Sequence, residues 1–317
     1  MRRTVRHGAY IWQRKDWPEF RWDSEALLEP LSRLSQLHGL LNGRMSMLGF
    51  NDKCRSLLSA MTEELISSSE IEGVLLNSNS VRSSIARRLG MEDGGLLVED
   101  HYVEGLVDVM LDAVRNCREP LTDERLFDWH AALFPFGRSG MHRITVADWR
   151  KGEEPMQVVS GAFGHEKVHY EAPPSDAVPA EMERLIEWCN TADHSPFIMA
   201  AVAHLWFVTV HPFDDGNGRI SRTLADMLLA RLDEDSARYY SMSAEINRNK
   251  KAYYEVLERT QKNNLDITEW MLWFFGCLEN AIVRASGIIE RTLQKAAYWD
   301  EFLGHIRNGL ALSQEIG

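Results

Sequence analysis

Residues 211–222 of this 317-residue chain read HPFDDGNGRISR, and they separate two segments that have the patterns of helices. The preceding run, residues 195–210, begins with Ser-Pro and is then almost wholly apolar, which is typical of a buried helix with a capping serine and a proline in its first turn. Pro212 disfavours helical geometry at His211, so we expect this helix to end there. Apolar residues then recur at helical spacing between 220 and 232, which predicts a second helix that begins near Gly218.

The Gly-Asn-Gly turn at 216–218 therefore lies at the start of a helix, where free backbone N–H groups and the helix dipole favour an anion. Arg219 and Arg222 are three residues apart in the first turn and lie on neighbouring faces. Arginine opposes the dipole at this end, and a polyphosphate ligand would explain that cost. His211 and Asp215 add a candidate general base and a candidate metal carboxylate. The alternative is a plain turn between core helices with solvated arginines, and the concurrence of all these groups argues against it.

Composition and charge narrow the class of protein. The 47 acidic and 35 basic residues give a net charge of −12, which argues against general affinity for nucleic acids or anionic membranes. The four cysteines are scattered without a CxxC pair, so neither a zinc site nor a disulfide framework is indicated. The basic start, MRRTVRH, is too short for a signal peptide, and no apolar run reaches the length of a membrane span once charges are counted. We expect a cytoplasmic protein without membrane or nucleic-acid partners.

Helical patterns cover most of the remaining chain. We expect helices over residues 24–42, 53–72, 100–117, 122–134, 178–189, 250–262 and 267–293. Ser24 is the expected cap of the first, and Gly73 is the expected residue that ends the second. Residues 136–174 have poor helical periodicity, and RITVADWR, MQVVSG and KVHYEAPP are interpreted as short strands or a hairpin. The aromatic segment 10–22 is expected to be extended and packed on the core. The sequence thus predicts a mainly α fold with one small β element.

The run at 211–222 resembles the signature of Fic-domain proteins, HxFx(D/E)GNGRxxR, and matches it at every specified position. Members of this family mostly transfer AMP from ATP to a Ser, Thr or Tyr hydroxyl of a protein. The resemblance makes His211 the base that deprotonates this hydroxyl, Asp215 the ligand of Mg²⁺, and Phe213 the anchor of the loop. It also implies an anion hole and phosphate contacts formed by Gly216, Asn217, Gly218, Arg219 and Arg222.

The resemblance also implies a domain organisation. It predicts a Fic-type helical core over residues 96–265, an N-terminal helical module over 1–95 and a C-terminal helical extension over 266–317. KVHYEAPP resembles the family's flap, a hairpin that receives the target protein as an added strand. Val168, His169 and Tyr170 would then bind the target. Tyr254 is matched to a tyrosine that similar sequences place against the adenine, and the alternative is that it packs its helix onto the core.

Residues 68–73, SSEIEG, match the (S/T)xxxE(G/N) pattern of the family's autoinhibitory helix, which we expect over about 53–73. Ser68 and Glu72 are its specified members. A carboxylate near a helix C-terminus is disfavoured unless it meets a cation. The resemblance identifies Arg222 as this cation, so that pairing would withdraw Arg222 from the γ-phosphate of ATP.

The leading interpretation is therefore a protein adenylyltransferase that uses ATP and Mg²⁺, modifies a protein target or itself, and is autoinhibited by Glu72. In one alternative, a de-adenylylating phosphodiesterase, Glu72 activates water and AMP is removed from a target. In another, the chain is a regulatory protein that senses a nucleotide without transferring it, but a pure binder could dispense with His211 and Asp215. A kinase-like relative carries lysine in the anion loop, so Gly218 favours AMP transfer. The sequence leaves open whether the protein forms a homodimer.

Overall fold

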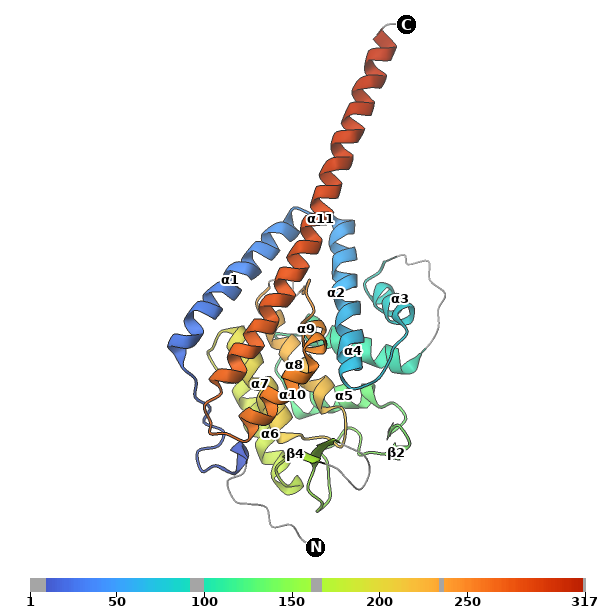
Figure 1. Ribbon diagram of the computed structural model, residues 1–317. Helices are drawn as coiled ribbons and strands as arrows, with labels where there is room; N and C mark the ends of the chain where they lie inside the picture. The colour runs from blue at the N-terminus through green and yellow to red at the C-terminus, as the bar shows by residue number, and fades with distance from the viewer. Residues whose placement is uncertain (1–9, 92–99, 161–166, 234–236, 316–317) are drawn as a thin grey trace.

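The computed structural model describes residues 10–91, 100–160, 167–233 and 237–315. These residues form a mainly helical body with two small antiparallel hairpins (Figure 1). The expected fold class is therefore confirmed. The expected boundary between the first two domains, at residues 95 and 96, lies outside the described residues.

The helices follow one another along the chain with few strands between them. They are α1 (Ser24–Ser46), α2 (Phe50–Ile71), α3 (Ser78–Arg88), α4 (His101–Arg115), α5 (Asp123–Leu133), α6 (Val178–Thr191), α7 (Pro196–Val210), α8 (Asn217–Ala230), α9 (Met242–Arg248), α10 (Lys250–Gln261) and α11 (Thr268–Glu315). Short 3₁₀ helices η1 and η2 span Ile11–Gln13 and Ser175–Ala177. The strands are β1 (Arg138–Ser139), β2 (His142–Arg143), β3 (Gln157–Ser160) and β4 (Lys167–Glu171).

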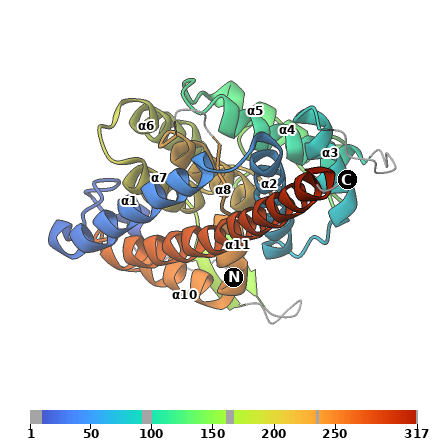
Figure 2. The ribbon, with the colours of Figure 1, turned by 90° about the horizontal axis from the view of Figure 1, so that it is seen from above.

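Helices α7 and α8 form the centre of the fold. Almost every residue of α7 is buried, because the helix is apolar all round and has neighbours on all sides. In Figure 2, α4, α5 and α6 lie along one side of this pair, and α1 and α11 lie along the other. The loop that joins α7 to α8 carries residues 211–216, so the most deeply packed elements of the molecule position the predicted site.

The N-terminal segment packs onto this core as expected from its aromatic residues, but it is not extended as predicted, because it forms the 3₁₀ helix η1 and a turn. The Trp17 ring lies 6.0 Å from that of Trp206 on α7 and 5.3 Å from that of Phe20. Arg21 forms a parallel bridge with Asp266, which precedes α11. The segment before α1 is therefore joined both to α7 and to the residues that precede α11.

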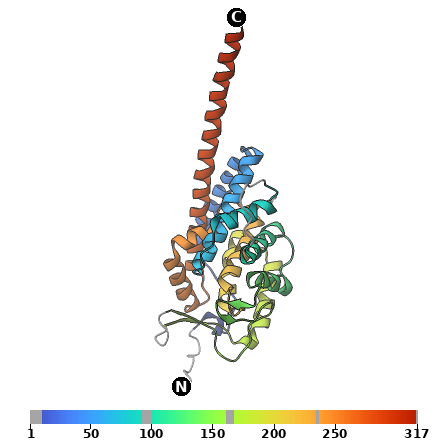
Figure 3. The same cartoon turned by 90° about the vertical axis from the view of Figure 1, so that its right-hand side faces the viewer.

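The long helix α11 differs most from the sequence expectation. It runs to Glu315, well beyond the expected end at residue 293, and its distal part projects from the body (Figures 1 and 3). Its segment from Thr268 to Lys295 is long and apolar enough to cross a membrane by length and composition, which corrects the expectation that no run would pass this test. Half of its most apolar window is buried against the rest of the protein, and a core helix has the same properties.

Several helix ends also differ from the prediction. Asp23, rather than Ser24, caps α1, because its Oδ1 accepts hydrogen bonds from the N–H groups of Glu25 and Ala26 at 3.0 and 3.1 Å. Ser195 makes no side-chain capping bond at the start of α7. Gly73 does end α2, with φ +78°, and the N–H groups that follow bond back to the last turn, as in a Schellman motif.

The β elements are smaller than predicted. β3 and β4 pair antiparallel with an irregularity between Val158 and Val159, which agrees with the expected hairpin. In the segment RITVADWR, only the first residue, Arg143, belongs to a strand. Together with His142 it forms β2, which pairs with β1. Residues 144–150 are irregular instead, because their polar groups bond to the 211–216 loop and to α5 rather than to a strand. The sequence patterns did not indicate α3 and α9, which are short and polar.

Candidate active site

His211 lies at the end of α7, where the buried helix meets the loop. Its backbone N–H still bonds to the carbonyl of Phe207 at 2.9 Å, but its φ of 52° and ψ of 59° are left-handed. The helix therefore ends where Pro212 predicted, although through a left-handed residue rather than the extended conformation usual before proline. This turn directs the chain across the N-terminus of α8 and leaves the half-buried imidazole at the edge of the turn.

The imidazole of His211 is arranged to accept a proton. Its Nδ1 lies 3.2 Å from the carbonyl oxygen of Val208. Since a carbonyl only accepts hydrogen bonds, Nδ1 carries the ring proton and Nε2 keeps its lone pair. Burial lowers the pKa of His211, and the positive charge of Arg150 lowers it further, against the raising effect of the Val208 bond. A neutral histidine with a free Nε2 is the form that a general base needs.

Arg150 fixes the backbone on both sides of His211. Its Nε donates to the His211 carbonyl at 2.7 Å, and its own N–H donates to the Pro212 carbonyl at 2.8 Å. The same guanidinium bonds to Pro173, which follows strand β4. Arg150 is almost fully buried, so these bonds are shielded from water. One side chain thus connects the imidazole to the segment predicted to be the flap.

Phe213 and Asn217 hold the loop itself. Phe213 is fully buried, as expected for an anchor, and its ring stacks on His130 with centroids 4.1 Å apart. The Asn217 side chain bonds to both the N–H and the C=O of Phe213, at 2.9 and 2.8 Å. The side chain of Asn217 therefore shapes the loop, and anion binding by the backbone N–H groups of the turn stays a prediction.

Both glycines of the turn lie close to side chains of other elements. Gly216 has φ +84°, and a Cβ atom there would lie 2.8 Å from the Phe134 ring. A Cβ atom on Gly218 would lie 2.1 Å from Oε1 of Glu72. The Glu72 carboxylate thus rests directly against the turn that was predicted to hold phosphate.

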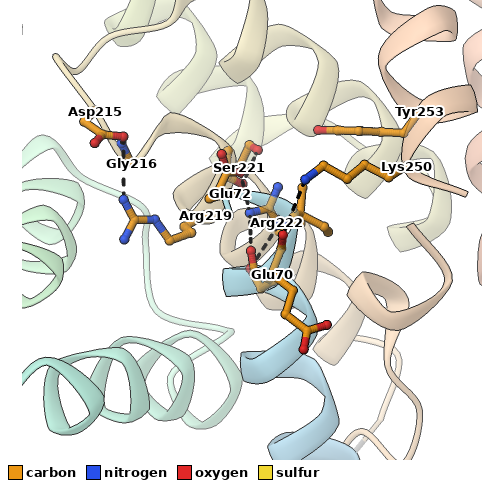
Figure 4. A network of polar contacts seen from close by, with 12 residues as sticks. Glu70, Glu72, Asp215, Gly216, Arg219, Ser221, Arg222, Lys250 and Tyr253 are labelled. Atoms are coloured by element: carbon orange, nitrogen blue, oxygen red, sulfur yellow. Dashed lines mark hydrogen bonds and ion pairs between the residues drawn. The ribbon is translucent and has the colours of Figure 1, made fainter. Parts of the chain in front are cut away.

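Arg222 pairs with the same carboxylate (Figure 4). Its Nη2 donates to Glu72 Oε1 at 2.7 Å and to the Ser68 carbonyl at 2.9 Å, and its Nε donates to the Ser68 hydroxyl at 2.9 Å. Burial alone would lower the pKa of Arg222, but the neighbouring Glu72 charge raises it. Nη1 is buried and has no hydrogen-bond partner among the described residues. Arg222 is therefore brought together with Ser68 and Glu72, from which it is separated by 154 and 150 positions along the chain.

Arg219 lies away from this pair, toward the other side of the turn (Figure 4). Its Nη1 donates to the hydroxyl of Tyr102 at 2.6 Å, and its guanidinium lies 4.9 Å from the ring centroid of Phe134. Its Nε is buried and unpaired among the described residues. The two arginines thus reach the turn from different sides, and each keeps a buried N–H group that an anion could accept.

Asp215 and Asp214 have different surroundings. Asp214 Oδ2 accepts the N–H of Thr145 at 2.8 Å, so this carboxylate holds neighbouring backbone. Asp215 accepts the Gly216 N–H at 2.5 Å and the Ser139 hydroxyl, and its side chain is 42% exposed. No cluster of three or more His, Cys, Asp or Glu side chains suited to a metal occurs in the described part of the chain. A single accessible carboxylate beside a phosphate site fits Mg²⁺, which commonly binds one or two carboxylates plus phosphates.

The remaining predicted residues surround this centre. Tyr254 is 41% exposed, and its hydroxyl lies 3.5 Å from the Ile71 carbonyl at the end of α2. Its neighbour Tyr253 is buried and bonds to His204 at 2.9 Å, so Tyr253 is the core residue of the two. The contact of Tyr254 with the adenine stays a prediction.

The predicted flap residues lie on β4. His169 pairs with Glu258 of α10, with Nδ1 and Oε2 2.7 Å apart. The side chain of Tyr170 points into the core and donates to the Thr209 carbonyl at 2.7 Å, so only its backbone is placed to meet a target. The side chain of Val168 is partly exposed. Target binding by β4 stays a prediction.

Four residues that contact the predicted site were not singled out from the sequence: Tyr102, His130, Ser139 and Arg150. His130 bonds through Nε2 to the Asp215 carbonyl at 3.1 Å, and burial lowers its pKa to about 4, so it is neutral. Only Arg150 lay in a segment that the sequence patterns had singled out, RITVADWR, which was interpreted as a short strand or hairpin. The others occur in ordinary helical or turn sequence and carry no local signal.

Two family models match the chain. Residues 120–229 match the Fic/DOC family, and residues 10–91 match a domain of unknown function, DUF4172. The protein adenylyltransferase fic-1 of Caenorhabditis elegans is 39% identical over 57 residues, and the protein adenylyltransferase Fic of Drosophila melanogaster is 47% identical over 53 residues. These matches cover 17% and 16% of this chain and 11% of each relative. The chain thus spans about a tenth of the length of the curated relatives that it matches.

Solved structures share the fold over more of the chain. A Fic family protein from Desulfovibrio desulfuricans G20 aligns with a TM-score of 0.64 at 20% identity, over 84% of this chain and 76% of that protein. A Fic domain containing signaling protein from Bacteroides thetaiotaomicron VPI-5482 aligns with a TM-score of 0.60 at 19% identity, over 81% of this chain and 97% of that protein. At these identities the likeness concerns the fold.

Proposed function

Since this chain is a Fic-domain protein, we propose that it transfers AMP from ATP to a hydroxyl group of a protein and that Glu72 holds this activity in check. The observation that carries the proposal is the neutral His211, whose Nδ1 bonds to the Val208 carbonyl and leaves Nε2 as the proton acceptor, in the loop that leads into the Gly-Asn-Gly turn. Relatives named protein adenylyltransferases support the same chemistry.

The proposed transfer is a nucleophilic displacement at the α-phosphorus. The target hydroxyl loses its proton to His211 Nε2, and its oxygen forms a bond to the α-phosphorus. The bond from that phosphorus to the bridging oxygen of the β-phosphate breaks, and pyrophosphate leaves. Positioning and charge neutralisation dominate such reactions, so the N–H groups of the turn, Arg219 and Arg222 are assigned to the phosphates. Asp215 would hold Mg²⁺, which would neutralise phosphate charge.

Glu72 competes with the nucleotide for the same groups. Its carboxylate occupies the space over Gly218 and engages Arg222, as a terminal phosphate would. While this pairing persists, ATP would have to bind without Arg222. Its α-phosphorus would then not be held in a geometry suitable for transfer. The target protein, a homodimer and the cytoplasmic location remain predictions.

The direct test is to incubate the purified protein with Mg²⁺ and ATP labelled at either the α- or the γ-phosphate. Covalent label from α-labelled ATP alone supports nucleotidyl transfer, whereas label from γ-labelled ATP would indicate a kinase and contradict the proposal. The same measurement on the Glu72→Gly variant tests the autoinhibition. Binding of ATP without any covalent label in either protein would favour a nucleotide sensor.

Removal of AMP is the second candidate function, and the position of Glu72 favours it. The carboxylate lies against the turn and its side chain is 30% exposed, so a water molecule could reach it and be activated for attack on a bound phosphodiester. The substrate for this test is a protein that the Glu72→Gly variant has adenylylated and that has then been purified away from the variant. Release of AMP by the wild type but not by Glu72→Gly would support this function.

A further inference from the structure

The last turn of α2 is held by a second set of contacts that lie outside the 211–222 motif. Asn247 of α9 donates from Nδ2 to the Glu70 carboxylate at 2.7 Å. Lys250, the first residue of α10, points its Nζ to the Glu70 carbonyl at 3.4 Å (Figure 4). Glu72 and Glu70 are thus bound from different elements, the first by α8 and the second by α9 and the start of α10.

The charge at this end of α2 explains why such contacts are needed. The helix ends with Glu70 and Glu72 and has no basic residue in its last turn. Both carboxylates face the negative end of the helix dipole, and carbonyl groups there lack helical partners. The ammonium of Lys250 supplies a positive charge and a second donor to the Glu70 carbonyl, which also accepts the Gly73 N–H. It thus adds to the compensation that Arg222 gives to this acidic turn.

Upstream contacts join α2 to the same helix α9. The buried Glu64 accepts the Ser241 hydroxyl at 2.8 Å and the Ser243 N–H at 3.0 Å. One exposed pair, Glu63 with Arg248 at 2.9 Å, lies beside them. These bonds hold α2 against α9 about two turns before Glu70. The contacts of Asn247 and Lys250 therefore stabilise the final turn of α2 rather than the position of the whole helix.

We propose that Asn247 and Lys250 are positioning residues that keep the last turn of α2 folded against the active site, and so set how often Glu72 occupies Arg222. This inference rests on the autoinhibition proposed above. Loss of either contact should loosen residues 69–74, because Gly73 and Val74 donate back to Glu70 and Ser69 at 3.0 Å only while this turn is formed. Glu72 would then leave Arg222 more often, and ATP would bind productively more often.

The test compares auto-adenylylation by Asn247→Ala and Lys250→Ala with that of the wild type, using α-labelled ATP. Loss of one hydrogen bond of this kind shifts an equilibrium about threefold to tenfold, so a rise of this size is expected. Lys251→Ala is the matched control, because its side chain is 91% exposed and pairs only weakly, at 3.8 Å, with Glu255. Lys250→Arg retains the charge and should stay close to the wild-type rate.

The decisive comparison places both substitutions in a Glu72→Gly background, where they should have no further effect because the inhibitory carboxylate is gone. An equal rise in that background would mean that they act on the nucleotide site, and would overturn the inference. So would an unchanged rate in both single variants when Glu72→Gly itself is activated. If Glu72→Gly is not activated, the proposed autoinhibition fails instead.

Hydrogen exchange separates positioning from general destabilisation. In Asn247→Ala and Lys250→Ala, the amides of Gly73 and Val74 should exchange faster, while amides in the middle of α7 keep wild-type protection. Uniformly faster exchange would show that the folded state as a whole is weakened, and would overturn the specific role. Lys250→Gln, which keeps the length and loses the charge, replaces Lys250→Ala if that variant does not fold.

Discussion

Replacing Glu72 with glycine should raise auto-adenylylation about tenfold to thirtyfold. The substitution removes the carboxylate that lies over Gly218 and bonds to Arg222 at 2.7 Å. A hydrogen bond to a charged group contributes about 1.5–3 kcal/mol, and about 1.4 kcal/mol is a factor of ten in an equilibrium. Arg222 is buried but the Glu72 side chain is 30% exposed, so we take the lower part of that range. The rise should appear as a higher rate of label transfer from α-labelled ATP.

The same change should lower stability in the absence of nucleotide. Arg222 is 3% exposed, and without Glu72 its charge keeps only the Ser68 contacts. A buried donor that loses its acceptor costs about 1–3 kcal/mol, so the melting temperature should fall by several degrees. ATP should restore it, and should stabilise the variant more than the wild type, because binding to the folded state adds to stability.

A double variant isolates the electrostatic cause. If Glu72 acts by withdrawing Arg222, the gain in Glu72→Gly should disappear when Arg222→Ala is added. Glu72→Gln keeps the size and one acceptor but loses the charge, and its rate should lie between those of the wild type and the glycine variant. An unchanged rate in Glu72→Gly, or a gain that persists without Arg222, would refute this reasoning.

Three further predictions concern the motif. His211→Ala should reduce transfer about 10²–10⁴-fold while calorimetry still detects ATP binding, since the imidazole only accepts a proton; loss of both together would make the residue structural. Asp215→Ala should remove the dependence of the rate on Mg²⁺, whereas Asp214→Ala should mainly lower the melting temperature by freeing the Thr145 N–H; the reverse result would exchange the two roles. Burial lowers the pKa of His211, and the neutral form is the active base, so kcat/KM of Glu72→Gly should be level around neutral pH and fall only below the ordinary imidazole pKa of about 6.5; a fall that begins above pH 7 would contradict this.

The central part of the fold could be predicted from the sequence because the residues that determine it act on their immediate neighbours. The apolar run before His211, the proline after it and the glycines at 216 and 218 act on neighbouring residues, so they predicted α7, the loop and α8 within one or two residues. Gly73 likewise ended α2 through its own backbone conformation. In contrast, α3 and α9 are too short and too polar for a periodic pattern, and α11 continues beyond the stretch in which such a pattern was evident.

The contacts that distinguish the two aspartates, orient His211 and place Glu72 against the Gly-Asn-Gly turn depend on the tertiary structure. A resemblance to a family suggested that Glu72 meets Arg222, but the path of α2 across α8 places its carboxylate against Gly218. No pattern indicated that Arg150 would bridge His211 to the segment after β4, because the two residues are separated by 61 positions and no short-range spacing relates them. Helix period and turn chemistry are properties of consecutive residues and can be read from the sequence. Which distant side chains share a buried site depends on how the finished helices pack.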